Sequence, residues 1–182
     1  MIISWHGFNY FKLKDNDHSL VLNPYALDKD SKFSLVNADV ILFSDPSQVS
    51  KTKFNKEAFV IDSPGEYEVK GVAITGISSE STNIIYHLFL DKLNIVHLGD
   101  LGEDKLTEEQ LEEIGQTDIL LMPKSAAEIV AQLEPKIIIP MCEAPEQFLK
   151  EIGVAGVEAQ PKLSISKEKL PEEPIVVVLK QS

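Results

Sequence analysis

The sequence contains one cysteine and few basic residues. Cys142 has no second cysteine to pair with, which excludes an internal disulfide and a cysteine-rich zinc module. Seventeen Lys and Arg residues stand against 29 Asp and Glu residues, which gives a formal net charge of −12 and a sequence pI near 4.7. Because an acidic surface repels phosphate backbones and anionic lipid headgroups, we expect neither a nucleic-acid partner nor a membrane partner.

Long apolar runs are also missing. No stretch approaches the roughly 18 apolar residues of a membrane-spanning helix, and residues 1–6 lack the basic start of a signal peptide. We therefore expect a cytoplasmic protein. Hydrophobic residues make up 43% of the 182 residues, an ordinary globular composition that suffices to bury a sizeable core. We expect a single domain over residues 1–182.

The first half of the chain has the pattern of β-strands. Short runs rich in β-branched and aromatic residues recur between turn-forming pairs such as Asp45-Pro46 and Pro64-Gly65. A tight hairpin turn is expected at residues 91–94, between two of these runs. Together the runs predict strands at residues 1–5, 10–14, 19–22, 39–43, 58–61, 67–69, 72–75, 83–90 and 94–98.

Helices enter after Gly102. Thr107 and Gln110 have the spacing of a capping box and predict a short acidic helix over residues 107–114. Ser125 and Glu128 predict a second capping box, which opens a helix that runs to about residue 133, and a third helix is expected over residues 145–152. The other apolar runs predict strands at residues 118–122, 136–140, 156–159, 163–166 and 175–179. The fold class is therefore mixed, α/β (α+β), with helices outside a pair of sheets.

Seven short motifs follow one another along the chain. They are Trp5-x-Gly7, Asn23-Pro24-Tyr25 and residues 38–42, 64–69, 97–102, 135–141, and 161–163 together with 176–179. In this order they resemble the metallo-β-lactamase fold superfamily, and within it the compact branch of metal-dependent hydrolases related to the ascorbate-6-phosphate lactonases. The resemblance implies a four-layer αβ/βα sandwich, in which two facing sheets carry helices on the outside.

The resemblance also implies a hydrolase in which one or two metal ions activate water at one edge of the sheets. Such relatives carry His-x-His-x-Asp-His after the Ala-Asp-Val strand, where residues 44–50 here contain no histidine. Segment 76–83, where a further histidine is expected, has none. Asp100 matches the bridging aspartate of the family, so at this position the residue type of the family's metal ligand is retained. The other ligand positions are occupied by Phe8, Asp45, Ser47, Val49, Ser50 and Cys142.

The four histidines of this chain fall elsewhere. His97 lies three residues before Asp100 on a predicted strand, and we interpret it as a structural, buried or partly buried residue. His87 lies within an apolar strand and has the same interpretation. His18 follows a turn signature that includes Asp15, and we expect it to be solvated.

Asp45, Asp100 and Cys142 are the candidate metal ligands that remain. Carboxylates and a thiolate are legitimate ligands of zinc, and all three positions belong to the metal edge of the family. Zn or Mn would be the cofactor if this atypical site exists. Against it, Cys142 is flanked by Glu143 and has no cation to lower its pKa, so we interpret it as a small packed residue.

Three hypotheses follow. The first is a catalytically inactive member of the fold without a cofactor, which acts by binding or assembly, as a homo-oligomer or with an active relative. The second is a metal-dependent hydrolase of a small molecule that uses Asp45, Asp100 and Cys142. The third is a small-molecule binding protein whose vacated cleft is lined by Phe8, Ser47, Ser50 and Cys142. We favour the first, because the loss of five or more ligands leaves no cage for a divalent ion.

Overall fold

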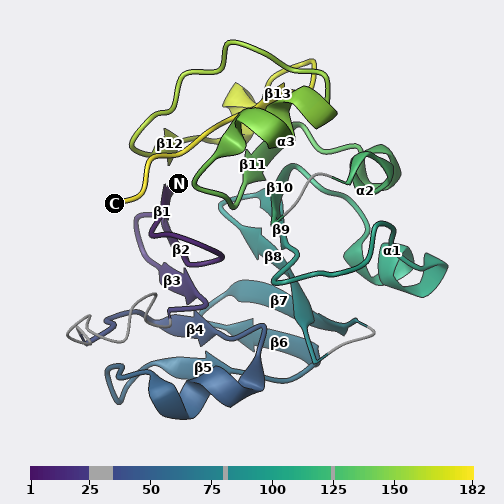
Figure 1. Cartoon of the computed structure of the whole chain (residues 1–182). Coiled ribbons are helices and arrows are strands. Elements are labelled where there is room, and N and C mark those ends of the chain that lie inside the picture. Colours follow the sequence, from purple (N-terminus) through teal and green to yellow (C-terminus); the bar gives the residue numbers. More distant parts are fainter. Residues whose placement is uncertain (25–34, 80–81, 124–125) are drawn as a thin grey trace.

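The computed structural model describes residues 1–24, 35–79, 82–123 and 126–182. Three features expected from the sequence touch residues outside these ranges: Tyr25 of the Asn-Pro-Tyr motif, Ser125 of the second capping box, and residues 80–81 of the shortened segment. Within the described part of the chain, the strands form two mixed sheets that face each other (Figure 1).

The first sheet has the order β12-β1-β2-β3-β4-β5. The pairs β12–β1, β1–β2 and β2–β3 are antiparallel, whereas the pairs β3–β4 and β4–β5 are parallel. The bounds are β1 Ile2–Trp5, β2 Phe11–Lys14, β3 Ser19–Leu22, β4 Val40–Leu42, β5 Phe59–Ile61 and β12 Leu163–Ser164.

The second sheet has the order β13-β11-β10-β9-β8-β7-β6. Its hairpins β6–β7 and β8–β9 are antiparallel, and β9, β10, β11 and β13 run parallel. The bounds are β6 Gly65–Val69, β7 Val72–Ser78, β8 Ile84–Leu90, β9 Leu93–His97, β10 Ile119–Met122, β11 Ile137–Pro140 and β13 Ile175–Val176.

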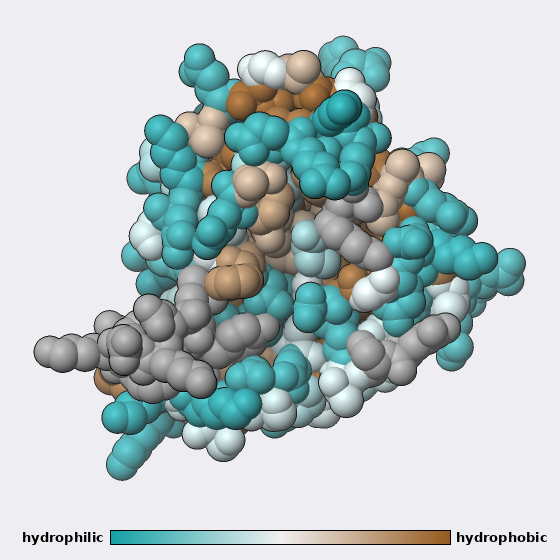
Figure 2. Space-filling view, viewed as in Figure 1, coloured by the Kyte–Doolittle hydropathy of each residue, from teal (hydrophilic) through white to brown (hydrophobic). Residues whose placement is uncertain are grey.

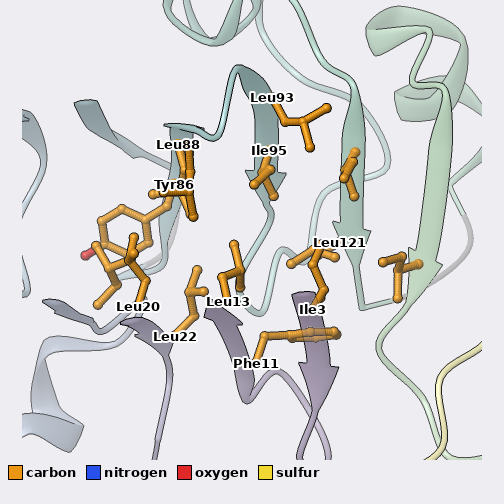
Figure 3. Close-up of a cluster of buried hydrophobic side chains, with 14 of the residues drawn as sticks. Ile3, Phe11, Leu13, Leu20, Leu22, Tyr86, Leu88, Leu93, Ile95 and Leu121 are labelled. Carbon is orange, nitrogen blue, oxygen red and sulfur yellow. The ribbon is translucent and has the colours of Figure 1, made fainter. Parts of the chain in front are cut away.

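The space between the sheets is filled by apolar side chains from alternate positions of the strands. Figure 3 shows side chains of β1, β2 and β3 pointing toward those of β8, β9 and β10, among them Leu13 opposite Ile95 and Ile3 opposite Leu121. These side chains are almost wholly excluded from solvent. Because side chains alternate between the two faces of a strand, one set of positions makes this core and the other set faces outward.

Two further apolar layers cover the outer faces of the sheets. Helices α1 (Glu108–Ile114), α2 (Ala127–Leu133) and α3 (Pro145–Glu151) pack with the outward side chains of the second sheet (Figure 1). The outer face of the first sheet packs against a segment that contains the 3₁₀ turn η1 (Pro46–Lys51) and Phe54. Hydrophilic side chains cover much of the surface seen in Figure 2. Strands β10 and β11 are therefore buried on both faces, as their apolar sequences predict.

The C-terminal part differs from the expectation. Residues 156–159 form no strand; their neighbour Gln160 makes one isolated bridge to Leu179. Val157 and Ala159 instead pack against the helical layer, so their apolar character reflects side-chain packing rather than strand pairing. Strand β13 is limited to two residues. Within the described residues, the helices are all too short or too polar to cross a lipid bilayer.

Candidate functional site

Two adjoining cavities lie at the edge where β4, β9, β10 and β11 end and β8 begins. One has a volume of about 340 Å³ and the other of about 270 Å³. Both are lined by Asn9 and Asp100, so they form one cleft. The larger cavity is completed by Ser44, Asp45, Thr82, Asn83, Gly102 and Glu103, and the smaller one by Phe8, Pro123 and Met141.

Asn83 joins the start of β8 to the end of β9 beneath this cleft. Its Nδ2 donates to Leu98 O at 2.9 Å, and its Oδ1 accepts the backbone N–H of Asp100 at 2.8 Å. The side chain is buried. One amide therefore satisfies an acceptor and a donor that would otherwise be unpaired at the end of a strand.

A second buried amide joins β3 to β4 in the same way. Asn23 accepts the backbone N–H of Ser44 at 2.7 Å, and its Nδ2 donates to Ser44 Oγ at 3.2 Å. Gly99 lies against the side chains of Asn83 and Ser44 with φ of +66°, in backbone that disfavours a side chain. Ser44 O accepts the N–H of Ile84, which ties the first sheet to the second.

His97 is fully buried under the cleft, as the sequence predicts for a structural histidine. Its Nδ1 accepts the N–H of Gly99 at 3.0 Å, so the ring proton lies on Nε2 and is donated to Asn9 O at 2.9 Å. Burial lowers the pKa of His97 to about 4, which keeps the ring neutral. The residue holds the β1–β2 loop against the end of β9.

Asp45 caps the turn η1 with its carboxylate. Oδ1 accepts the N–H of Ser47 at 2.9 Å, and Oδ2 accepts Ser47 Oγ at 2.9 Å and Gln48 Nε2 at 2.8 Å. Burial raises the pKa of Asp45, but the hydrogen bonds from Gln48 and Ser47 outweigh it and leave the pKa below its ordinary value. The local turn thus uses both oxygens of this candidate ligand.

Asp100 is exposed in the cleft, and Glu103 lies beside it. Oε2 of Glu103 is buried without a hydrogen-bond partner among the described residues. The described part of the lining thus contains three carboxylates but no imidazole. Among the described residues, no three His, Cys, Asp or Glu side chains form a group that could hold a metal ion. This donor set does not fit the histidine-rich zinc centre that the family implies.

Cys142 lies apart from the two carboxylates. It packs half-buried against the helical layer, whereas its neighbour Met141 faces the core between the sheets and lines the smaller cavity. Burial and the nearby Glu146 carboxylate raise the pKa of the Cys142 thiol, so its thiolate is disfavoured. The structure brings Asp45 and Asp100 to one cavity and places Cys142 outside its described lining.

The cleft differs from the expected one in other residues. Phe8 lines it as predicted, but Ser47, Ser50 and Cys142 are not among its described lining residues. Asn9, Asn83 and Glu103 take their place and were missed by sequence reasoning. The sequence signal that could have identified Asn83 was an asparagine at the start of a predicted strand, and in the structure it directly precedes β8.

The family is shown by sequence. The family model of the beta-lactamase superfamily domain matches residues 2–142, and the chain therefore belongs to the metallo-β-lactamase superfamily. A candidate Zn-dependent hydrolase of this superfamily from Thermotoga maritima is 31% identical, with a TM-score of 0.81 and 98% of each chain covered. Among proteins of curated function, none matches.

More distant structures share the fold. A metallo hydrolase from Ignicoccus hospitalis is 14% identical with a TM-score of 0.61, over 91% of this chain and 99% of that one. An isothiocyanate hydrolase from Delia radicum gut bacteria is 9% identical with a TM-score of 0.62, over 100% of this chain and 97% of that one. At these identities the likeness concerns the fold alone.

Proposed function

We propose that this chain is a member of the metallo-β-lactamase superfamily that acts by binding or assembly rather than by metal-dependent hydrolysis. We place it with the compact branch related to the ascorbate-6-phosphate lactonases, as one domain over residues 1–182. The observation that carries the proposal is the hydrogen-bonded frame of Asn23, Ser44, Asn83 and Gly99, which occupies the edge where the family binds metal.

Two features of the remaining acidic residues support this proposal. Asp45 is committed to the cap of η1, and Asp100 has no imidazole beside it to complete a zinc site. Asp100 and the neighbouring Glu103 supply carboxylates alone, without the imidazole ligands and hydrogen-bonded outer groups that fix a divalent ion in a defined geometry. Hydrolysis in the manner of the family therefore lacks its chemical groups.

Metal stoichiometry tests the proposal. The protein is expressed with zinc and manganese supplied, purified without tag or chelator, and analysed by elemental mass spectrometry beside the Thermotoga maritima relative. We expect far less than one ion per chain. Asp100→Ala should match the wild type in metal content and, like the exposed control Glu57→Ala, change the free energy of unfolding by no more than about 0.5 kcal/mol.

One ion per chain, lost in Asp100→Ala and retained in Glu57→Ala, would contradict the proposal. That outcome would favour the second hypothesis, an atypical hydrolase site that binds Zn or Mn through oxygen ligands. One observation supports this second hypothesis: Oε2 of Glu103, beside Asp100, has no hydrogen-bond partner among the described residues.

Binding of a small molecule in the cleft is a second candidate function. Phe8 is 57% exposed at the smaller cavity, which places an aromatic ring beside the Asp100 carboxylate and the Asn9 amide. A metabolite screen by thermal shift checks this function, since a ligand that binds the folded state raises its melting temperature. The shift should be lost in Phe8→Ala and kept in Phe59→Ala, an exposed phenylalanine on β5.

A further inference from the structure

Two turns from different sheets meet at His18. The β2–β3 turn is organised by Asp15, whose Oδ1 accepts the N–H of Asp17 at 2.8 Å and of His18 at 2.6 Å. The β6–β7 turn consists of Lys70 and Gly71, with φ of 52° and 82°, between the paired residues Val69 and Val72. Positive φ at both positions is typical of a tight hairpin turn and sets the direction of the Lys70 carbonyl.

The imidazole of His18 bonds to both turns at once. Nδ1 lies 2.9 Å from Asp15 Oδ2, and Nε2 lies 2.8 Å from Lys70 O. A carboxylate and a carbonyl can only accept, so each ring nitrogen must donate a proton for both bonds to form. Both bonds therefore require the imidazolium; His18 is partly exposed to solvent, and the sequence did not predict these two bonds.

The charges around the ring also favour the imidazolium. Asp15, Asp17 and Asp39 contribute three carboxylates, and the Lys70 ammonium is paired with Asp39. Asp39 in turn accepts the N–H of Ser19 at 2.9 Å, so Lys70 is tied to the first sheet through its side chain as well as its carbonyl. Without a charge on His18, the three carboxylates face one cation.

We propose that His18 is a pH-sensitive latch between the two sheets: the imidazolium ties the β2–β3 turn to the β6–β7 turn, and its deprotonation releases one of the two bonds. This role is independent of the proposed function, because the latch involves none of the residues that line the cleft. Its consequence is a β6–β7 hairpin that is held at pH values below the pKa of His18 and loosened above it.

The direction of the titration agrees with this geometry. The hydrogen bond to Asp15 raises the pKa of His18 above 6.5, burial opposes it, and the Lys70 carbonyl and the Asp17 charge add to the rise. Since the pKa is higher in the folded state, the stabilisation is complete below the unfolded value of 6.5 and is lost as pH rises through the folded value. Each pKa unit by which the folded value exceeds the unfolded value corresponds to a tenfold change in the folding equilibrium constant.

Nitrogen NMR of the histidine rings tests the latch directly on the wild-type protein. At pH 6 both ring nitrogens of His18 should carry protons, and its pKa should lie above 6.5 and fall in Asp15→Asn. A pKa at or below 6.5, or one proton on the ring at pH 6, would overturn the proposal whether or not any variant folds.

Stability of a matched pair of variants provides the second test. His18→Gln cannot be charged, whereas His87→Gln removes a histidine of β8 whose bond to Asn94 stays within one sheet. Between pH 6 and pH 9, the wild type should lose its stability advantage over His18→Gln, and amide exchange at Val69 and Val72 should rise, corrected for intrinsic rates. Burial lowers the pKa of His87, so His87→Gln should change the pH dependence only below about pH 7 and keep the wild-type dependence above it. An identical pH dependence in His18→Gln would contradict the latch.

Discussion

Gly99 and Asn83 are in close contact under the cleft: a Cβ on Gly99 would clash with Asn83 Oδ1. The same oxygen accepts the N–H of Asp100, so it cannot withdraw without losing that bond. The position of Asp100 therefore depends on a glycine and an amide.

Gly99→Ala should lower the free energy of unfolding by about 3 kcal/mol or more. The positive φ costs about 1–2 kcal/mol for a side chain, and the clash with Asn83 and Ser44 adds about 1–3 kcal/mol of strain. Gly71→Ala is the control, because its φ is also positive but nothing lies within 4 Å of its Cβ. Urea unfolding measures both, and equal losses would show that the contact with Asn83 is unimportant.

Tyr86→Phe should cost about 1–2 kcal/mol. The fully buried Tyr86 on β8 shares its hydroxyl proton between Phe43 O at 3.0 Å and Ile61 O at 3.1 Å, which lie at the ends of strands in the other sheet. Burial raises the pKa of Tyr86, so the hydroxyl remains a donor at alkaline pH. Tyr67→Phe loses an exposed hydrogen bond to Ser63 and should lower the free energy of unfolding by only a few tenths of the loss in Tyr86→Phe. The melting temperatures of the two variants make the comparison.

Acid should destabilise the protein through His97. Its pKa is about 4 in the folded state and 6.5 when unfolded, so the unfolded state binds the proton first and stability falls as pH drops from about 6.5 to about 4. The loss is on the order of 3 kcal/mol. His6 and His87 also have lowered pKa values, so the difference between wild type and His97→Gln isolates the effect. Denaturation at several pH values checks it, and parallel curves would refute the assignment.

Lys167→Met should cost about 3 kcal/mol, because it leaves the Asp118 carboxylate buried without its cation. The Asp118 side chain is 3% exposed, and its Oδ2 accepts Lys167 Nζ at 2.8 Å and the N–H of Asn94 at 2.8 Å. Combining the substitution with Asp118→Asn should cost less than the sum of the two single changes. Lys162→Met, at an exposed lysine, should stay within about 0.5 kcal/mol. Additive costs in urea unfolding would mean that the pair is not coupled.

Local structure could be predicted from the sequence wherever residues close in the sequence determine it. The capping box of Thr107 and Gln110 is confirmed by both of its hydrogen bonds, and residues 91–92 form the expected hairpin turn. The buried position of His97 is also confirmed. In contrast, residues 156–159 have apolar side chains at alternate positions but form no strand, because a strand also needs a neighbour with free backbone groups.

The sequence by itself determined most strands and helices, the net negative charge and the absence of histidine from residues 44–50, because these depend on residue type and short-range periodicity. Only the tertiary structure decided which polar groups meet. Asn83 reaches Asp100 across 17 residues, and His18 reaches the carbonyl of Lys70 across 52. Such partners depend on strand order, register and the packing of one sheet on the other, so the cleft and the latch appear only once the two sheets are assembled.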